Sequence, residues 1–388
     1  MEQIDLSASL NQIITGDALQ VLKTVPSESV QCIVTSPPYY ALRDYGMPGQ
    51  IGLEATPAIY ITRLVEVFRE ARRVLRSDGT CWLNLGDTYA NDQKRGGHPS
   101  GKHRKELHTM TRPQRYTGLP GKNLLMIPAR IALALQDDGW ILRSDCIWHK
   151  TNAMPESVTD RPTSAYEHIF LLVKSERYYY DADAIKEPGK EWAGSAGTFA
   201  RAGGKATHLA IPGQNRVSHR EDREDRVPAG RNKRNVWSIA SQPYSGTHFA
   251  TMPPKLVEPC ILAGTSPRAC EQCGAPWQRQ VERIPMIIRR GPKAGGYGSR
   301  TTDGLSGTMV APAEAQTVGW QPTCKCSHNT GSGKCVVLDP FLGAGTVALV
   351  TLKHNRLSLG IELNPAYVAI ARKRISLGPL WEGNEVLA

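Results

Sequence analysis

A hydroxyl, two prolines and an aromatic ring follow an apolar stretch near the start of the chain. Ser36, Pro37, Pro38 and Tyr39 come directly after residues 30–34, which we predict to be a strand. Prolines cannot continue a β-ladder, so they stiffen the loop and leave the Pro37 carbonyl oxygen free to accept a hydrogen bond. That oxygen and Ser36 Oγ are suited to accept both N–H bonds of an amine, which would make its nitrogen a better nucleophile. A proline-rich turn at the end of a strand is an equally good interpretation of this run taken alone.

A second candidate site is a glycine-containing loop near the other end of the chain. Asp339 ends a predicted strand, and Phe341, Gly343, Gly345 and Thr346 follow it. Glycines let the backbone approach a ligand, and the helix predicted from Thr346 offers unpaired N–H groups to an anion. Gly-x-Gly on its own is more often a tight turn than a ligand site.

An acidic residue ends the next predicted strand. Residues 356–361 form this strand, and Glu362 stands at its tip, where folds of this kind bind ribose hydroxyls. Asn364 is a suitable N-cap and Pro365 a suitable first residue for the helix that comes next. The strand, the glycine loop and the acidic tip together favour a nucleotide-like cofactor over a structural turn.

Strands and helices alternate along the rest of the chain. In the helix predicted over 57–76, Leu64, Phe68, Ala71 and Leu75 share one face. The alternation indicates an α/β fold, with a mostly parallel sheet and helices on both faces. The further strands are predicted at 11–15, 80–85, 140–148 and 167–173, and the further helices at 18–25 and 124–137.

Length, charge and the N-terminus limit the class of protein. A chain of 388 residues is long enough for one large domain with inserts or for two domains. Because no apolar run is long enough to span a bilayer and the N-terminus lacks a signal peptide, we expect a cytoplasmic protein without membrane contact and without disulfides. A formal net charge of +11 suits a polyanionic partner.

Three segments interrupt the alternation. Residues 91–121 and 186–235 are rich in basic side chains, and residues 265–334 hold four clustered cysteines. Composition alone favours solvated loops for the two basic segments. With a nucleic-acid partner, the same loops become candidates for contacts to phosphates and base edges.

The cysteine cluster has the ligand types of a metal site. Cys270 and Cys273 form a Cys-x-x-Cys pair, and Cys324 and Cys326 a Cys-x-Cys pair. Four thiolates in a reducing compartment are enough for a closed tetrahedral zinc site, although the two pairs lie farther apart than in common zinc fingers. His328 is an alternative ligand, or an exposed loop residue. Three cysteines lie in apolar strands and are expected in the core, Cys32, Cys81 and Cys146, whereas Cys260 and Cys335 carry no predicted role.

The order of these motifs resembles one enzyme family. The chain is similar to the bacterial and phage DNA amino-methyltransferases of the β class, in which the catalytic block precedes the cofactor block. The similarity covers most of the chain outside the basic and cysteine-rich segments. Its matching stretches are residues 15–17, 35–40, 42–46, 50–54, 84–87, 235–237, 248–253 and 339–346.

The resemblance implies a circularly permuted Rossmann-like class I methyltransferase sheet. The strand before Ser36 and the strand before Phe341 would then be neighbours, at the point of the sheet where ligands bind. The implied organisation is a catalytic half over 1–181 with the loop insert 91–121, a target-recognition region over 182–246, a cofactor-contacting segment over 247–264, the cysteine-rich insert over 265–334 and a cofactor-binding half over 335–388.

The resemblance also implies a methyl donor, S-adenosylmethionine, and a role for each motif residue. Ser36, Pro37, Pro38 and Tyr39 would be catalytic, with Tyr39 stacking on a base taken out of the duplex. Asp17 would accept from the adenine amino group of the donor, although an N-cap is nearly as good an interpretation. Glu362 would hold the ribose. The full predicted cofactor set is Asp17, Ala18, Phe249, Ala250, Thr251, Asp339, Phe341, Gly343, Gly345, Thr346, Glu362 and Asn364, and the predicted DNA contacts are Arg43, Arg216, Arg220, Arg231, Lys233 and Arg234.

The first residue of the catalytic motif bears on which base is methylated. Ser36 is typical of the cytosine-N4 enzymes, whereas adenine-N6 enzymes usually carry aspartate there, so we favour cytosine and keep adenine as the alternative. A protein-glutamine methyltransferase is more remote, because those enzymes carry Asn before Pro-Pro-Tyr and place the cofactor block first. An inactive DNA-binding relative is unsupported, since Ser36, Tyr39, Gly343 and Glu362 are all present. The expected partners are double-stranded DNA and a companion restriction endonuclease, with monomer and homodimer both left open.

Overall fold

The computed structural model describes residues 4, 10–90, 117–187, 231–242, 251–284, 287–290, 307–311 and 314–376. The chain divides into two compact units. The first combines Met1–Ala184, Arg234–Gln278 and Trp320–Ala388, and the second combines Ile185–Lys233 and Arg279–Gly319.

The first unit is built on an eight-stranded sheet with the order β1-β12-β11-β2-β3-β5-β4-β6. All its neighbouring strands are parallel except at β5, which runs antiparallel to both β3 and β4. The strands are β1 (Gln12–Thr15), β2 (Val30–Thr35), β3 (Leu75–Leu85), β4 (Ile141–His149), β5 (Tyr166–Val173), β6 (Val236–Ser238), β11 (Val336–Asp339) and β12 (Leu357–Glu362).

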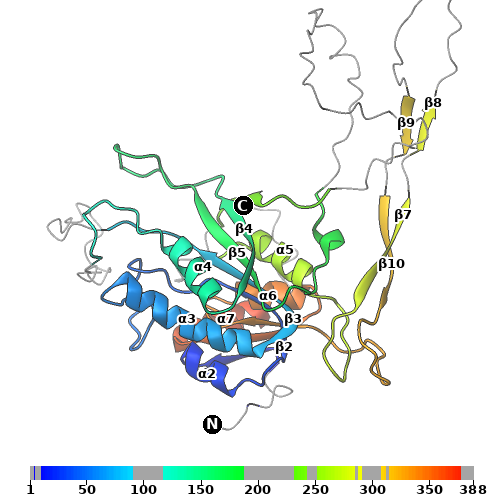
Figure 1. The fold of residues 1–388 in the computed structure, drawn as a ribbon, viewed down its shortest axis with the longest axis horizontal. Helices are drawn as coiled ribbons and strands as arrows, with labels where there is room; N and C mark the ends of the chain where they lie inside the picture. Colours follow the sequence, from blue (N-terminus) through cyan, green and yellow to red (C-terminus); the bar gives the residue numbers. More distant parts are fainter. Residues whose placement is uncertain are drawn as a thin grey trace, which may run out of the picture. The chain divides into compact units, whose positions relative to one another are not determined.

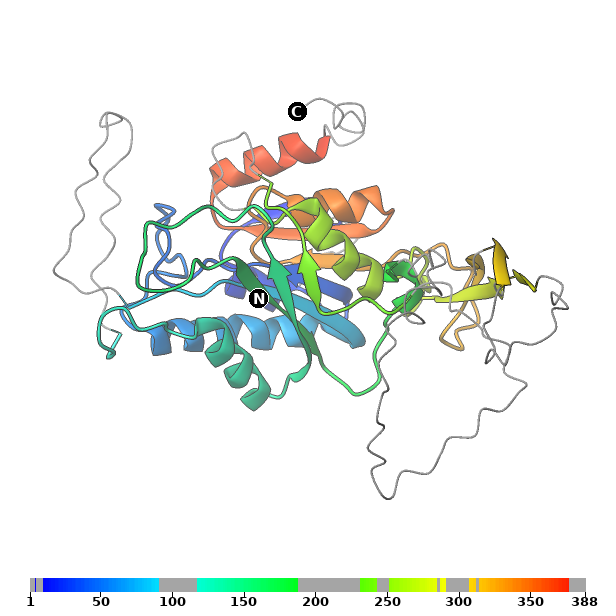
Figure 2. The ribbon, with the colours of Figure 1, turned by 90° about the horizontal axis from the view of Figure 1, so that it is seen from above.

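Helices cover both faces of this sheet, as the alternation predicts. Figure 2 shows α3 and α4 on one side of the sheet, and α5, α6 and α7 on the other, while α2 lies beside α3 in Figure 1. The helices are α2 (Ala18–Thr24), α3 (Pro57–Val74), α4 (Ile127–Asp137), α5 (Pro254–Gly264), α6 (Thr346–Lys353) and α7 (Pro365–Ser376), and a 3-10 turn η1 spans Ala182–Ile185. Both faces of β2 are therefore covered, and all six of its residues are buried.

The sheet order confirms the predicted permutation. The C-terminal strands β11 and β12 lie between β1 and β2, so β11 pairs directly with β2, through Val337–Cys32 and Leu338–Ile33. The strand that precedes Ser36 and the strand that precedes Phe341 are thus parallel neighbours. Their carboxyl ends open at the same edge of the sheet, where open α/β sheets bind ligands.

Two predicted helix boundaries are wrong, and each has a local cause. The helix predicted to reach residue 76 ends at Val74, because Leu75 already pairs with Val30 as the first residue of β3, ahead of a register shift between β2 and β3. The helix predicted from residue 124 starts at Ile127, because Leu124 bridges to Tyr89 and Pro128 occupies the first helical turn. The apolar face predicted for α3 is buried, with Leu64, Phe68 and Ala71 fully covered.

The second unit holds short strands from the cysteine-rich insert. They form two two-stranded sheets, β10–β7 and β8–β9. Their bounds are β7 (Gln278–Ile284), β8 (Ile287–Arg290), β9 (Gly307–Ala311) and β10 (Glu314–Gln321). Among the helices described, none has the length and apolar character needed to cross a bilayer. Residues 91–116 and 188–230, which make up most of the two basic segments, lie outside the described residues.

Candidate active site

The loops after β2 and β11 are tied together where the two strands end. Thr35, the last residue of β2, donates a hydrogen bond from Oγ1 to Asp339 Oδ1 at 2.6 Å, and Asp339 is the last residue of β11. The same carboxylate oxygen accepts from the Phe341 amide at 3.0 Å. Burial raises the pKa of Asp339 to about 7, because the charged form is poorly solvated there. Ser36 and Phe341 therefore leave the sheet from one fixed point.

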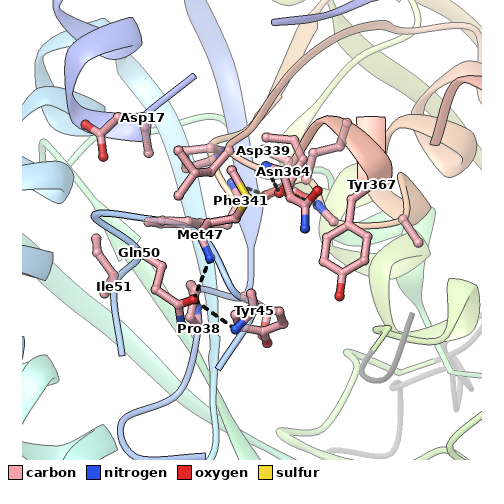
Figure 3. A pocket seen from close by; sticks show the side chains of 18 of the residues that line it. Asp17, Pro38, Tyr45, Met47, Gln50, Ile51, Asp339, Phe341, Asn364 and Tyr367 are labelled. Carbon is pink, nitrogen blue, oxygen red and sulfur yellow. Dashed lines mark hydrogen bonds between the residues drawn. The ribbon is translucent and has the colours of Figure 1, made fainter. Parts of the chain in front are cut away.

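A pocket opens at this point, and most of the predicted donor residues line it together with Ser36 and Pro38. Of the other predicted residues, Pro37, Tyr39 and Gly345 do not line it. Figure 3 shows Asp17 and Tyr367 on opposite sides of the pocket, with Met47 and Phe341 between them. The predicted site residues that line the pocket are Asp17, Ala18, Ser36, Pro38, Thr251, Asp339, Phe341, Gly343, Thr346, Glu362 and Asn364. Phe249 and Ala250 lie outside the described residues.

The carboxylate of Glu362 is held in place by the backbone. Its Oε2 accepts from the Gly343 amide and its Oε1 from the Asn364 amide, each at 2.8 Å. Burial raises the pKa of Glu362, and these amides oppose that rise by stabilising the charged form. Asn364 caps α7, as predicted, by accepting from the Ala366 amide at 2.9 Å. The acidic tip of β12 is thus aimed at the pocket and keeps lone pairs for a ligand.

Gly343 and Gly345, in the loop after β11, require the absence of a side chain for different structural reasons. Both adopt positive φ, 54° at Gly343 and 80° at Gly345. Gly343 lines the pocket, so its bare backbone lies close to any ligand there. A Cβ at Gly345 would lie 3.0 Å from Ala371 Cβ, so this glycine allows α6 and α7 to pack closely. The sequence predicted ligand approach for both positions, and the geometry at Gly345 adds a packing role.

The N-cap interpretation of Asp17 is confirmed, and its contact with the donor stays a prediction. It is the N-cap of α2, where its Oδ1 accepts from the Gln20 amide at 3.1 Å. It also lines the pocket. Because a carboxylate has several lone pairs, capping the helix leaves acceptor capacity for a ligand amino group.

A folded segment after the catalytic loop forms another wall of the pocket. Gln50 Oε1 accepts from the amides of Tyr45 and Met47, at 2.8 and 3.3 Å, and so fixes these two residues at the pocket (Figure 3). Arg43 precedes them. Burial raises the pKa of both Tyr45 and Tyr367, and the positive charge of Arg43 opposes this rise. The predicted DNA contact Arg43 therefore lies beside the pocket.

The catalytic loop joins a polar network that reaches across three strands. Ser36 Oγ lies 3.2 Å from the Tyr39 hydroxyl, which lies 2.6 Å from Glu167 Oε2 and 3.1 Å from Asn84 Oδ1. Asn84 Nδ2 donates to the same Glu167 oxygen at 3.0 Å. Lys150 forms an ion pair with the other oxygen of Glu167. Burial, and then the negative charge of Glu167, raises the pKa of Tyr39 well above its ordinary value.

The chemistry of this network fixes the direction of its hydrogen bonds. A carboxylate paired with Lys150 can only accept, so the Tyr39 hydroxyl donates to Glu167. The Tyr39 oxygen then accepts from Ser36, which leaves the lone pairs of Ser36 Oγ available to a ligand. Within the described part of the chain no hydrogen bond reaches the Pro37 carbonyl oxygen. Both acceptors predicted for an amine are therefore free.

Sequence reasoning missed Glu167 and Lys150, and quoted Asn84 only as part of a matching stretch. Glu167 is a charged residue near the start of a strand whose last five residues are buried, which is a weak local signal. Strand pairing brings it into place, since Trp148 pairs with Glu167 and Asn84 with Ile169. Gly86 follows Asn84 closely in the chain, and a Cβ there would lie 2.6 Å from Tyr39 Cε2. The network is thus a product of the sheet rather than of one motif.

The remaining predicted residues are only partly described. Arg216 and Arg220 lie outside the described residues. Arg231 forms an ion pair with Glu187 at 2.9 Å, within the second unit. Lys233 is placed in that same unit, while Arg234 begins the next stretch of the first unit and accepts a hydrogen bond from Trp237 Nε1 through its carbonyl oxygen. Contact with DNA stays a prediction for all six basic residues.

The predicted metal ligands come together. The sulfur atoms of Cys270, Cys273, Cys324 and Cys326, called the four-cysteine cluster below, all lie within 4.8 Å of one another. His328 is exposed and is not part of the cluster. The predicted core cysteines, Cys32, Cys81 and Cys146, are buried. Cys260 and Cys335, which had no predicted role, are buried as well.

Comparison with known proteins decides the family of this site. The DNA methylase family of N6 and N4 methyltransferases matches residues 30–270 and 326–373, which contain both loops and the network. The chain belongs to this family. It is an S-adenosylmethionine-dependent DNA amino-methyltransferase, as the motifs and their order predict.

Relatives within the family match almost the whole chain. The type II methyltransferase M.Cfr9I of Citrobacter freundii is 38% identical over 94% of this chain and 87% of its own length. The type II methyltransferase M.SmaI of Serratia marcescens is 35% identical over 94% of this chain and 90% of its own length. Among solved structures, the cytosine-N4-specific PvuII DNA methyltransferase is 15% identical, covers 93% of this chain and 85% of its own, and has a TM-score of 0.50. This last likeness concerns the fold alone.

Proposed function

We propose that this enzyme transfers the methyl group of S-adenosylmethionine directly to the exocyclic N4 of a cytosine that is flipped out of duplex DNA. The observation that carries the proposal is that Ser36 lines the same pocket as the residues of the donor loop. The hydrogen bond between Thr35 and Asp339 keeps these two loops in a fixed relation.

The pocket offers a complementary group to each part of the donor. When bound, S-adenosylmethionine supplies an electrophilic methyl group on a sulfonium. We expect Asp17, which lines the pocket, to accept from the adenine amino group of the donor. The Glu362 carboxylate, which two amides already hold, would accept from the ribose hydroxyls of the donor. The methionine part of the donor would be surrounded by other residues that line the pocket, namely Thr251, Phe341, Gly343 and Thr346.

The catalytic loop acts on the amine of the target base. Its lone pair is delocalised into the ring, so the nitrogen must become more tetrahedral before it attacks. Ser36 Oγ and the Pro37 carbonyl would each accept one N–H, which turns the lone pair toward the methyl group. Glu167 acts through Tyr39 and keeps the Ser36 lone pairs available. Tyr39 also provides the aromatic face against which a flipped base would stack.

The choice of base and partners follows from the same residues. A neutral hydroxyl at the first motif position favours cytosine N4, and adenine N6 is the alternative. The positive charge of the chain suits double-stranded DNA, with target recognition assigned to 182–246 and help from 91–121. Because the relatives are type II methyltransferases, we extend the proposal to a companion restriction endonuclease in the same cell.

Nucleoside analysis tests the proposed product. Unmethylated genomic DNA is incubated with the purified chain and S-adenosylmethionine, digested to nucleosides and analysed by mass spectrometry. N4-methylcytosine is the expected product. N6-methyladenine would retain the reaction type and reject the inference from Ser36, and DNA without any new methylated base would reject the proposal.

A further inference from the structure

The four-cysteine cluster has the dimensions of a metal site. In a tetrahedral zinc site with Zn–S bonds of about 2.3 Å, neighbouring sulfurs lie about 3.8 Å apart. The observed sulfurs, all within 4.8 Å of one another, reach this arrangement with small side-chain adjustments. All nine cysteines of the chain are free, so the four sulfurs are not committed to disulfides.

Backbone and side-chain N–H groups point at these sulfurs. The amides of Gln272 and Cys273 donate to the sulfur of Cys270, and the amide of Ala275 donates to the sulfur of Cys273. On the other pair, Asn329 Nδ2 donates to Cys324 Sγ at 3.2 Å. Such donors stabilise thiolates, which are the form that binds a metal. Several N–H groups therefore face the cluster, as they do around the sulfur ligands of metal sites.

The turn between the first two cysteines is held on the main sheet. Gly274, at φ +69°, follows Cys273 and closes this turn by donating its amide to the Cys270 carbonyl oxygen, and its own carbonyl oxygen accepts from Gln31 Nε2 at 2.9 Å. Gln31 Oε1 in turn accepts from the amide of Val336, the first residue of β11, at 2.6 Å. Arg76 donates to the carbonyl oxygen of Cys273. These contacts fix the cluster at the starts of β2 and β11, at the opposite strand ends from the donor pocket.

The position along the chain shows what a metal would do there. The chain leaves the first unit after Gln278 and returns to it at Trp320. The segment between, Arg279–Gly319, is called the excursion below, and the two cysteine pairs lie just before and just after it in the sequence. Glu271 already links the two sides, since its carboxylate accepts from the Ser332 amide at 2.9 Å and from the Ser332 hydroxyl at 2.6 Å. Closing so long a loop carries an entropic cost that grows with its length.

From these observations we infer that the four-cysteine cluster binds one zinc ion, which ties together the two ends of the excursion 279–319. With four protein ligands the site is closed to water and substrate, so its role is structural rather than catalytic. The inference does not depend on which base the enzyme methylates.

Metal content tests the inference directly. The full chain is purified without chelators and its zinc is measured by mass spectrometry, for the wild type, for Cys273→Ser and for Cys146→Ser. Cys273 is exposed, so its substitution removes a ligand without opening the core. Cys146 lies in β4, outside the cluster, beside the Ser144 hydroxyl at 3.4 Å, and serves as the matched control. We expect one zinc ion per chain in the wild type and control, and its loss in Cys273→Ser.

A second measurement covers the case in which Cys273→Ser does not fold. In the wild-type chain, a mercurial reagent that caps thiols should release the zinc to a metal-sensitive dye, one ion per chain. Cobalt bound in its place should show thiolate-to-cobalt charge transfer and the absorption of a tetrahedral site. Three results would each overturn the inference. The wild-type chain could hold no zinc after incubation with zinc, or folded Cys273→Ser could retain its zinc in full. The freshly purified chain could also contain a disulfide within the cluster.

Discussion

The two loops of the active site are held in different ways. The donor loop is held by its own neighbourhood, because Glu362 accepts from the amides of Gly343 and Asn364, all within the consecutive elements β11, α6, β12 and α7 and the loops between them. The catalytic loop is held by side chains from distant strands, because Tyr39 contacts Asn84 and Glu167, and Glu167 pairs with Lys150. One half of the site is local in sequence and the other is assembled by the sheet.

This difference separates binding from chemistry. The donor half presents backbone amides, glycines and the carboxylates of Asp17 and Glu362, which would recognise a ligand that is the same in every reaction cycle. The catalytic half presents a serine hydroxyl whose direction depends on a chain of hydrogen bonds. Substitutions in the first half should therefore change donor affinity, and substitutions in the second should change turnover.

The largest effect is expected from Ser36→Ala. This change removes one of the two acceptors for the target amine, and we expect kcat to fall by about 100-fold or more, by analogy with the loss of one transition-state hydrogen-bond partner. The donor Kd, measured by calorimetry without DNA, should stay at the wild-type value. A variant that loses donor binding in parallel with kcat would break the division between the two halves.

A smaller loss of turnover is expected from Glu167→Gln. Glutamine Nε2 can donate to Tyr39, which reverses the hydrogen bond and lets Tyr39 donate to Ser36. One of the two lone pairs of Ser36 Oγ is then no longer available to the target amine. We expect kcat to fall about tenfold, in line with hydrogen bonds to charged groups. The kcat of the double variant Tyr39→Phe/Glu167→Gln should be no lower than that of Tyr39→Phe alone, because both changes interrupt the same series of hydrogen bonds from Glu167 to Ser36. Additive losses would show that Glu167 acts by another route.

On the donor side, Glu362→Gln should weaken binding rather than turnover. A glutamine side chain cannot accept from both the Gly343 and Asn364 amides, so one N–H would face another N–H. We expect the donor Kd to rise about tenfold, with kcat at saturating donor unchanged. The matched control is Glu258→Gln, at a carboxylate of α5 that pairs with His354 at 2.8 Å. An equal rise in Kd for the control would show a general effect of lost charge.

A last prediction concerns stability rather than catalysis, at the hydrogen-bonded joint between the two loops. Asp339 has a pKa raised from 3.8 to about 7, so the folded chain keeps a proton that the unfolded chain releases between roughly pH 4 and pH 7. Its contribution to the free energy of unfolding is therefore fully present at low pH and is lost as pH rises toward 7, by up to about 1.4 kcal/mol per pH unit. Asp339→Asn keeps an acceptor for Thr35 and Phe341 but cannot titrate. Denaturant unfolding should show the variant gaining stability relative to the wild type across this window, and a constant difference would contradict the burial argument.

The same contrast explains what the sequence could predict. Glu362, Asn364 and the loop after β11 follow one another in the chain, so their positions at a strand tip and a helix start could be read from local signals. The neighbouring placement of β2 and β11 was implied by the resemblance to the amino-methyltransferases, and their pairing confirms it. Glu167 and Lys150 could not be predicted, because only the register between β3, β5 and β4 brings them to Tyr39. The start of α4 was misplaced for a similar reason, since a bridge to Tyr89 draws Leu124 out of the helix.

The most direct test of a shared site is a crystal structure of the full chain with sinefungin, a donor analogue that carries an amine where the transferred methyl group would be. The account predicts ribose hydroxyls on Glu362, the adenine beside Asp17, and that amine facing Ser36. An analogue bound with its ribose away from Glu362, or with the amine on the far side of the pocket from Ser36, would contradict it.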